Sequence, residues 1–191
     1  FVEIPYDDTW LRDSGPVTLK SGAGHPPAAG THHRADDDDA GFCLADFRFT
    51  GWGGKFGAAR DDALVEGLLE RDVFRPGIGH ARIDWALEGG AIESDGRGTI
   101  LTTWRCLHQR HPDLAREQMT LQLRESLGAR RVLWLDHGYL QGDDTDAHID
   151  TLARFAPGDG IVFQACDAPD DPHFEALAAM HAELAALRTP D

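Results

Sequence analysis

The 191-residue sequence has no apolar run close to the ~20 residues that a membrane-spanning helix needs, so we expect a soluble protein without a membrane partner. It has only three cysteines, Cys43, Cys106 and Cys166, and no Cys-x-x-Cys pair. Three widely spaced thiols exclude a disulfide framework and indicate a reducing compartment, for which we expect the cytoplasm. Basic residues are also few, because 18 Lys and Arg stand against 33 Asp and Glu, a formal net charge of -15. This charge excludes nucleic acid as a partner and favours a cationic ligand.

The remaining composition, 41% hydrophobic and 27% charged residues, is typical of a globular domain. Residues 20–41 depart from it, being rich in Gly, Pro, His and Asp, and we expect them to form a mobile polar loop. The chain begins at Phe1 without an initiator Met or a signal-peptide layout, and residues 189–191 open a turn that leads to no further element. We therefore expect residues 1–191 to be a single domain truncated from a longer chain.

The spacing of apolar residues predicts an α/β fold. The predicted strands are 43–49, 81–87, 91–94, 99–103, 131–135, 149–155 and 160–164, and the predicted helices are 61–73, 112–127 and 172–187. Residues 95–98, Asp-Gly-Arg-Gly, have the composition of a tight hairpin turn. From residue 91 to residue 135 the order is therefore strand, strand, helix, strand. The same order begins again at residue 149 without its last strand, which indicates a repeated ββαβ module.

Two segments combine carboxylates with glycine in a way that packing alone does not require. In the first, Asp8 and Asp13 flank Trp10 ahead of a Gly-Pro turn, although an ordinary ion-paired turn explains this segment equally well. In the second, Glu88 ends a strand and precedes Gly89 and a further glycine, which can adopt backbone angles closed to other residues. A β-bulge with an exposed carboxylate is the alternative for this segment.

A third segment, residues 142–150, places four aspartates around a single histidine, His148. His148 and Asp150 are two residues apart, so at the start of a strand their side chains project to the same face. Neighbouring carboxylates favour the protonated imidazole, which suits a proton donor near neutral pH. A proton donor beside several carboxylates fits a planar cation with several N–H donors, such as a guanidinium group, which carboxylates bind through paired hydrogen bonds.

Four segments together resemble the family of agmatine deiminases and Porphyromonas-type peptidylarginine deiminases, in the family's order and spacing. They are residues 10–16, 51–55, 88–103 and 142–150. The resemblance implies a guanidino-group-modifying hydrolase whose fold is a five-bladed α/β propeller, or pentein, of ββαβ modules around a central site. It also implies that this chain is a partial copy, about the first half to two thirds of the deiminase catalytic domain.

The resemblance also implies the roles of the site residues. Asp13 and Asp150 would hold the guanidinium, with His148 as the general acid/base. Glu88 would support the site, and Trp10, with the neighbouring Asp8, would line it. A cysteine thiolate would attack the guanidinium carbon, and neither a metal nor another cofactor would be needed.

The family's nucleophilic cysteine follows a glycine-rich segment near the end of a chain about twice as long, and no segment here matches it. Cys106 matches a family cysteine that is not the nucleophile, so we expect it to be structural and this chain to be inactive alone. Two further departures affect the substrate prediction. Residues 107–112 lack the Asn- and Arg-rich form common in agmatine deiminases, and Ala147 stands where glycine is usual.

The main hypothesis is an agmatine deiminase, which converts agmatine to N-carbamoylputrescine and ammonia in putrescine and polyamine biosynthesis. A peptidylarginine deiminase is the first alternative. Residues 146–150 also resemble a metal motif of manganese ureohydrolases, but residues 167–172 fit that family's second metal motif poorly. A non-catalytic guanidine-binding fragment is the third alternative, and a homo-oligomer stays open.

Overall fold

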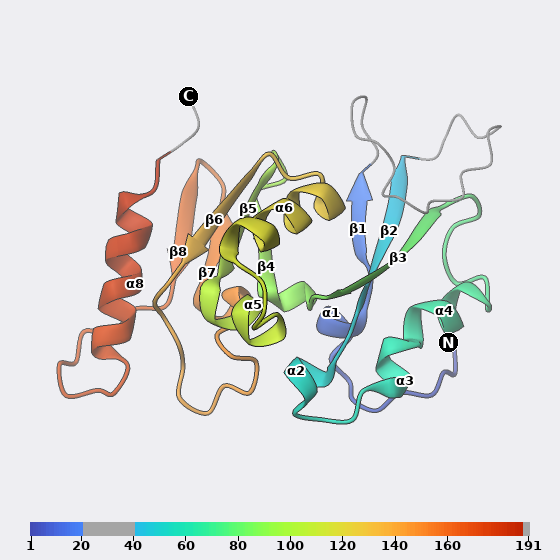
Figure 1. Ribbon diagram of the computed structural model, residues 1–191, viewed down its shortest axis with the longest axis horizontal. Coiled ribbons are helices and arrows are strands. Elements are labelled where there is room, and N and C mark those ends of the chain that lie inside the picture. The colour runs from blue at the N-terminus through green and yellow to red at the C-terminus, as the bar shows by residue number, and fades with distance from the viewer. Residues whose placement is uncertain (21–40, 189–191) are drawn as a thin grey trace. The chain divides into compact units, whose positions relative to one another are not determined.

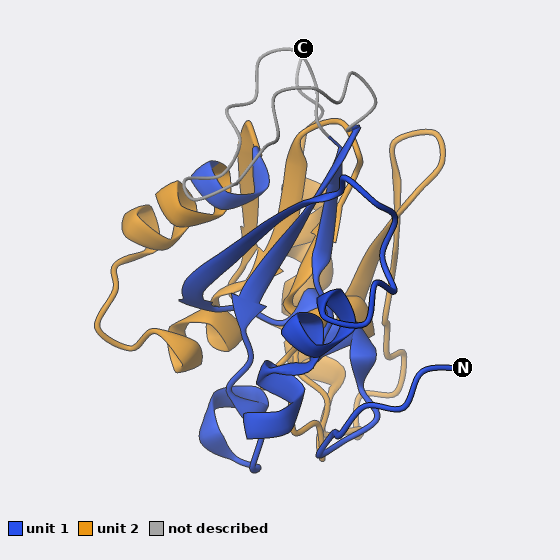
Figure 2. Ribbon diagram, turned by 90° about the vertical axis from the view of Figure 1, so that its right-hand side faces the viewer, with its two compact units in different colours: residues 1–89, 125–128 blue, residues 90–124, 129–191 orange. Residues whose placement is uncertain are grey.

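The computed structural model describes residues 1–20 and 41–188 (Figure 1). Nearly all of the loop expected at residues 20–41 lies outside these residues. The chain divides into two compact units, which Figure 2 colours separately: unit 1 has residues 1–89 and 125–128, and unit 2 has residues 90–124 and 129–191. Within the described ranges, no helix is both long enough and apolar enough to cross a membrane.

Unit 1 is built on a three-stranded sheet in the order β1-β2-β3. Strands β1 and β2 pair antiparallel, whereas β2 and β3 pair parallel. The five residues inside β2 are all buried, as befits a central strand. The strands are β1 (Val17–Lys20), β2 (Phe42–Arg48) and β3 (Gly79–Ala86), and the helical segments are α1 (Leu11–Ser14), α2 (Gly51–Gly54), α3 (Ala59–Asp62) and α4 (Leu64–Leu69).

Unit 2 contains a sheet of the same plan, in the order β4-β5-β6, and a two-stranded antiparallel sheet, β7-β8. Its strands are β4 (Ile92–Ser94), β5 (Thr99–Thr103), β6 (Arg131–Leu135), β7 (Ala153–Ala156) and β8 (Gly160–Phe163). Its helices are α5 (Trp104–Arg110), α7 (Ile149–Leu152), α8 (Phe174–Ala186) and most of α6 (Arg116–Leu127), whose last three residues are assigned to unit 1. A short 3-10 turn, η1 (Gly89–Ala91), begins at the last residue of unit 1 and precedes β4. The apolar face of α8, with Leu177, Met180 and Leu184, packs into a core shared with Leu101 and Leu135.

The two three-stranded sheets repeat one supersecondary pattern: two antiparallel strands, helical segments, and a third strand parallel to the second. The ββαβ order predicted for residues 91–135 is therefore confirmed, and so is the α/β class. The equivalent pattern in unit 1 was missed, because β1 is short and residues 21–40 separate it from β2. Strands β7 and β8 followed by α8 repeat the beginning of the pattern. Closure into five blades stays a prediction.

Three predicted elements differ from the structure. The strand predicted at 149–155 is wrong in its first half, where residues 149–152 form α7 and only β7 is extended. The helix predicted at 61–73 ends at Leu69 and is interrupted at Ala63. The helix predicted at 112–127 begins at Arg116, and the separate helix α5 before it was missed. Thr103 starts α5, because its hydroxyl accepts the backbone N–H of Cys106 at 3.3 Å.

Candidate functional site

In unit 1 the candidate residues lie at one end of the sheet. The carboxyl ends of the parallel strands β2 and β3 meet there, and the antiparallel β1 begins there. Asp13 precedes β1, and Glu88 follows β3. A Cβ on Gly89 would lie 2.2 Å from the carbonyl oxygen of Arg12, so glycine is needed for this close approach. Gly89 is not among the positive-φ residues, so the close approach, and not a left-handed backbone, requires glycine at this position. The close approach brings the segments that carry Asp13 and Glu88 together.

Both of these carboxylates are buried, with Glu88 0% and Asp13 7% exposed. A buried carboxylate needs hydrogen-bond donors to offset its lost hydration. For Asp13, one donor is the indole Nε1–H of Trp52, at 3.0 Å from Oδ2. Asp13 and Glu88 are therefore inside the protein, and the alternative of an exposed Glu88 in a bulge is wrong.

Trp10 and Asp8 have different surroundings. Trp10 is 60% exposed at the start of α1. Asp8 is exposed as well, and its backbone N–H donates to the carboxylate of the buried Asp61, at 3.0 Å from Oδ2. Asp61 thus anchors the segment ahead of α1. The substrate-lining roles of Trp10 and Asp8 stay predictions.

In unit 2, His148 and Asp150 lie close together at the start of α7. His148 is only 2% exposed, and its Nδ1 is 4.0 Å from Oδ1 of Asp150. The strand geometry used to predict their common orientation was wrong, because His148 precedes the first turn of a helix and Asp150 belongs to that turn. The pairing itself is present, and a buried imidazole beside a carboxylate is suited to proton transfer.

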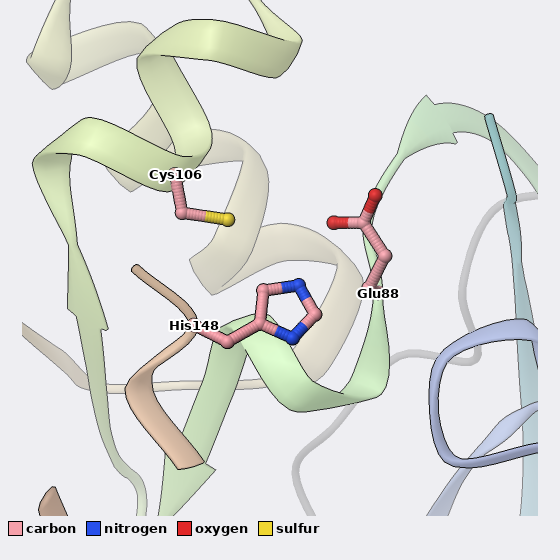
Figure 3. Close-up of side chains that lie close together, drawn as sticks. All are labelled: Glu88, Cys106 and His148. Atoms are coloured by element: carbon pink, nitrogen blue, oxygen red, sulfur yellow. The ribbon is translucent and has the colours of Figure 1, made fainter. Parts of the chain in front are cut away.

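The thiol of Cys106 lies beside His148, as Figure 3 shows. Cys106 is 0% exposed, and its Sγ and a ring nitrogen of His148 are within 4.8 Å of each other. Glu88, which Figure 3 also draws, belongs to unit 1. A thiolate and an imidazole are common metal ligands, so this pair would supply two of the ligands that a metal needs. The absence of a metal stays a prediction.

The loop before His148 has an unfavourable backbone that tertiary contacts hold in place. Asp146 and Ala147 have φ of 64° and 69°, a left-handed conformation that costs about 1–2 kcal/mol for each non-glycine residue. The hydroxyl of Thr103 donates to the carbonyl oxygen of Ala147 at 2.7 Å. The positive φ gives the physical reason why glycine suits position 147, and it means that alanine there carries strain.

Arg110 is a second anchor of this loop, and sequence reasoning missed it. Its side chain is 0% exposed, its Nη1 donates to Oδ2 of Asp146 at 2.8 Å, and its Nη2 donates to the carbonyl oxygen of Thr145 at 3.0 Å. A buried guanidinium is stable only with such partners. Arg110 therefore ties α5 to the loop that places His148.

Asp143 organises the same loop from its other end. Its Oδ1 accepts the backbone N–H of Thr145 at 2.8 Å and also the Thr145 hydroxyl, and its Oδ2 accepts the N–H of Ala147 at 2.8 Å. Burial by itself would raise the pKa of Asp143, but these hydrogen bonds and the nearby His148 outweigh it and lower the pKa. The charged carboxylate thus stabilises the loop.

We expect Asp143→Asn to lower the free energy of unfolding by about 2 kcal/mol at pH 7, because the amide NH₂ would face a backbone N–H. The native pKa is lowered, so the stabilisation is present above the pKa of the unfolded chain and is lost as pH falls through the native pKa. Urea unfolding of both proteins from pH 7 to pH 3 tests this. A difference that stayed constant over this range would contradict it.

A family model described as Porphyromonas-type peptidyl-arginine deiminase matches residues 1–191. The chain belongs to this family. The agmatine deiminase of Stutzerimonas stutzeri is 35% identical over 187 residues, which cover 94% of this chain and 45% of that protein.

Solved structures show the same likeness. One is an agmatine deiminase of C. jejuni, a cysteine-to-serine variant with substrate bound, at 31% identity and a TM-score of 0.81 over 97% of this chain and 50% of that one. Another is the agmatine deiminase of Enterococcus faecalis, at 28% identity and a TM-score of 0.78 over 97% of this chain and 47% of that one. The chain thus spans about half the length of these relatives.

Proposed function

We propose that the whole protein containing this sequence hydrolyses a guanidino C–N bond and that its substrate is agmatine. The observation that carries the proposal is the buried imidazole of His148, 4.0 Å from the carboxylate of Asp150, in a chain of this deiminase family. Agmatine is favoured over peptidyl-arginine because the agmatine deiminase of Stutzerimonas stutzeri is 35% identical to this chain in sequence. Agmatine is a dication, and the net charge of -15 of this chain favours a positively charged substrate.

Binding rests on carboxylates. Asp13 and Asp150 each accept N–H bonds from the planar guanidinium, which their paired oxygens match in shape and charge. Glu88 contributes a further negative charge from the end of β3. Trp10 and Asp8 provide apolar and polar contacts for the remainder of the substrate. These roles follow from the family resemblance, and the burial of Asp13 and Glu88 supports them.

His148 carries the proton transfers. A thiolate adds to the guanidinium carbon, and the protonated imidazole then gives its proton to the departing nitrogen, which leaves as ammonia. The covalent product is a thiouronium, and the neutral imidazole removes a proton from the water that attacks it. Hydrolysis returns the thiolate, leaves the imidazole protonated again and releases N-carbamoylputrescine with one further proton, which ammonia takes up as ammonium. One water is consumed for each ammonia formed.

We further propose that the nucleophile lies outside these 191 residues. Burial raises the pKa of the Cys43 thiol and keeps it protonated, and Cys43 lies on β2 of unit 1. Cys106 has no exposed surface for a substrate to reach, so its role is to pack against His148. The repeated ββαβ pattern supports a five-bladed pentein fold for the whole protein. The proposed reaction of the whole protein fits putrescine synthesis in the cytoplasm.

Removal of metal ions by a chelator distinguishes this proposal from the manganese ureohydrolase alternative. We expect the whole protein, dialysed against EDTA, to keep its rate of ammonia release from agmatine, because every step above uses side chains alone. The measurement is ammonia release before and after dialysis, with the metal content of both samples determined. Loss of activity on chelation, restored by Mn²⁺, would favour the ureohydrolase mechanism.

A further inference from the structure

The segment after β2 forms a left-handed turn that includes a tryptophan. Gly51, Trp52, Gly53 and Gly54 have φ of 64°, 55°, 78° and 84°. Hydrogen bonds close the turn, with the N–H of Gly54 donating to the carbonyl oxygen of Thr50 at 2.8 Å. Three of the four positions are glycines, which adopt positive φ without strain. Trp52 is the exception, because a residue with a side chain is strained at positive φ.

Packing and a hydrogen bond hold Trp52 in this conformation. Its side chain is 5% exposed, and its ring meets Phe49 edge to face at 5.1 Å between centroids and Phe56 at 5.7 Å. Its Nε1–H donates to Oδ2 of Asp13 at 3.0 Å, inside the protein and across 39 residues of sequence. The strained turn therefore aims an indole N–H at one oxygen of a particular carboxylate.

The orientation of the Asp13 carboxylate matters for binding a guanidinium group. The torsion that turns the carboxylate plane of an aspartate is broad, so packing alone defines it poorly. Paired hydrogen bonds to a planar guanidinium require a defined plane. A donor fixed to Oδ2 of Asp13 supplies that definition before substrate arrives, which lowers the entropic cost of binding.

We propose that Trp52 is a positioning residue that orients the Asp13 carboxylate for guanidinium binding. The proposal rests on the proposed function, because it takes Asp13 as a substrate ligand. The proposal gives a role to residues 51–55, one of the four segments that resemble the deiminase family and the one to which the resemblance assigned no function. Trp52 acts through Asp13 and need not touch substrate.

Kinetics of the whole protein test the role. Trp52→Phe keeps an aromatic ring but removes the donor, and we expect kcat/KM for agmatine to fall about tenfold, mainly through KM. In an Asp13→Asn background the same change should alter kcat/KM less than about twofold. Trp134→Phe is the matched control, because it removes the indole donor to the Thr120 hydroxyl, at 3.0 Å in unit 2, and should leave kcat/KM within about twofold. Equal effects of Trp52→Phe in both backgrounds would overturn the proposal.

The contact itself is tested without activity by the NMR signal of the Trp52 indole N–H. We expect Asp13→Asn to shift this signal and speed its exchange with solvent, while the Trp134 signal stays unchanged. An unshifted Trp52 signal would overturn the proposal, even if Trp52→Phe fails to fold. An inactive parent protein whose Trp52 signal does respond to Asp13→Asn would refute the proposed function and leave the positioning contact established.

Discussion

Replacing His148 with asparagine is expected to lower kcat for agmatine by about 10²–10⁴-fold in the whole protein, with a much smaller change in KM. Asparagine keeps a hydrogen-bonding group of similar size, but it can neither protonate ammonia nor take a proton from water. Steady-state kinetics with ammonia detection measure the effect. Because His148 is buried, urea unfolding of the variant must also show that the fold is retained.

A histidine outside the candidate site provides the control. His137 is exposed and contacts Glu183, with 2.6 Å between Nδ1 and Oε1. His137→Asn makes the same chemical change away from the site and should leave kcat within about twofold. If folded His148→Asn kept kcat within about tenfold of the parent, His148 would be a packing residue and the mechanism would lose its acid/base group.

The Asp13→Asn variant is expected to lose about 30- to 1000-fold in kcat/KM, and most of the loss should appear in KM. In the proposed role of Asp13, the change removes one negative acceptor for the guanidinium while keeping the shape of the side chain, and the lost charge-assisted bonds suggest roughly 2–4 kcal/mol. Titration calorimetry with agmatine and steady-state kinetics together separate binding from turnover.

Asp84→Asn is the matched control for this charge change in unit 1. Asp84 contacts Arg48 at 3.2 Å, and its side chain is 88% exposed, so its removal should change kcat/KM by less than twofold. Equal losses in the two variants would mean that net charge, rather than Asp13, attracts the substrate. An unchanged KM in Asp13→Asn would remove Asp13 from the binding site.

Local patterns predicted much of the fold. β6 lies at residues 131–135 as predicted, because Val132, Leu133 and Leu135 form a compact apolar run after the glycine that ends α6. The β4–β5 hairpin follows from its Asp-Gly turn. α7 could not be predicted in this way, since Ile149 and Thr151 are β-branched and suit a strand. The Thr151 hydroxyl instead donates to the carbonyl oxygen of His148 at 2.9 Å, within the helical turn.

The candidate site was predictable only where its residues share a sequence motif. His148 and Asp150 are neighbours in the chain, and their pairing was found. The supporting contacts join residues far apart in sequence: Trp52 lies 39 residues from Asp13, and Arg110 lies 36 residues from Asp146. Residue spacing carries no signal for such contacts. The strained φ of Ala147 could not be predicted from this sequence alone. The glycine that is usual at this position in the family is the one signal that indicates a positive φ.

The most direct test of the central claim is identification of the products that the whole protein forms from agmatine. Deiminase chemistry breaks the bond to a terminal guanidinium nitrogen, so we expect N-carbamoylputrescine and ammonia in equal amounts. Ureohydrolase chemistry would break the other C–N bond and give putrescine and urea. Either these products or the absence of turnover would contradict the account, and turnover of an arginine peptide in preference to agmatine would reassign the substrate.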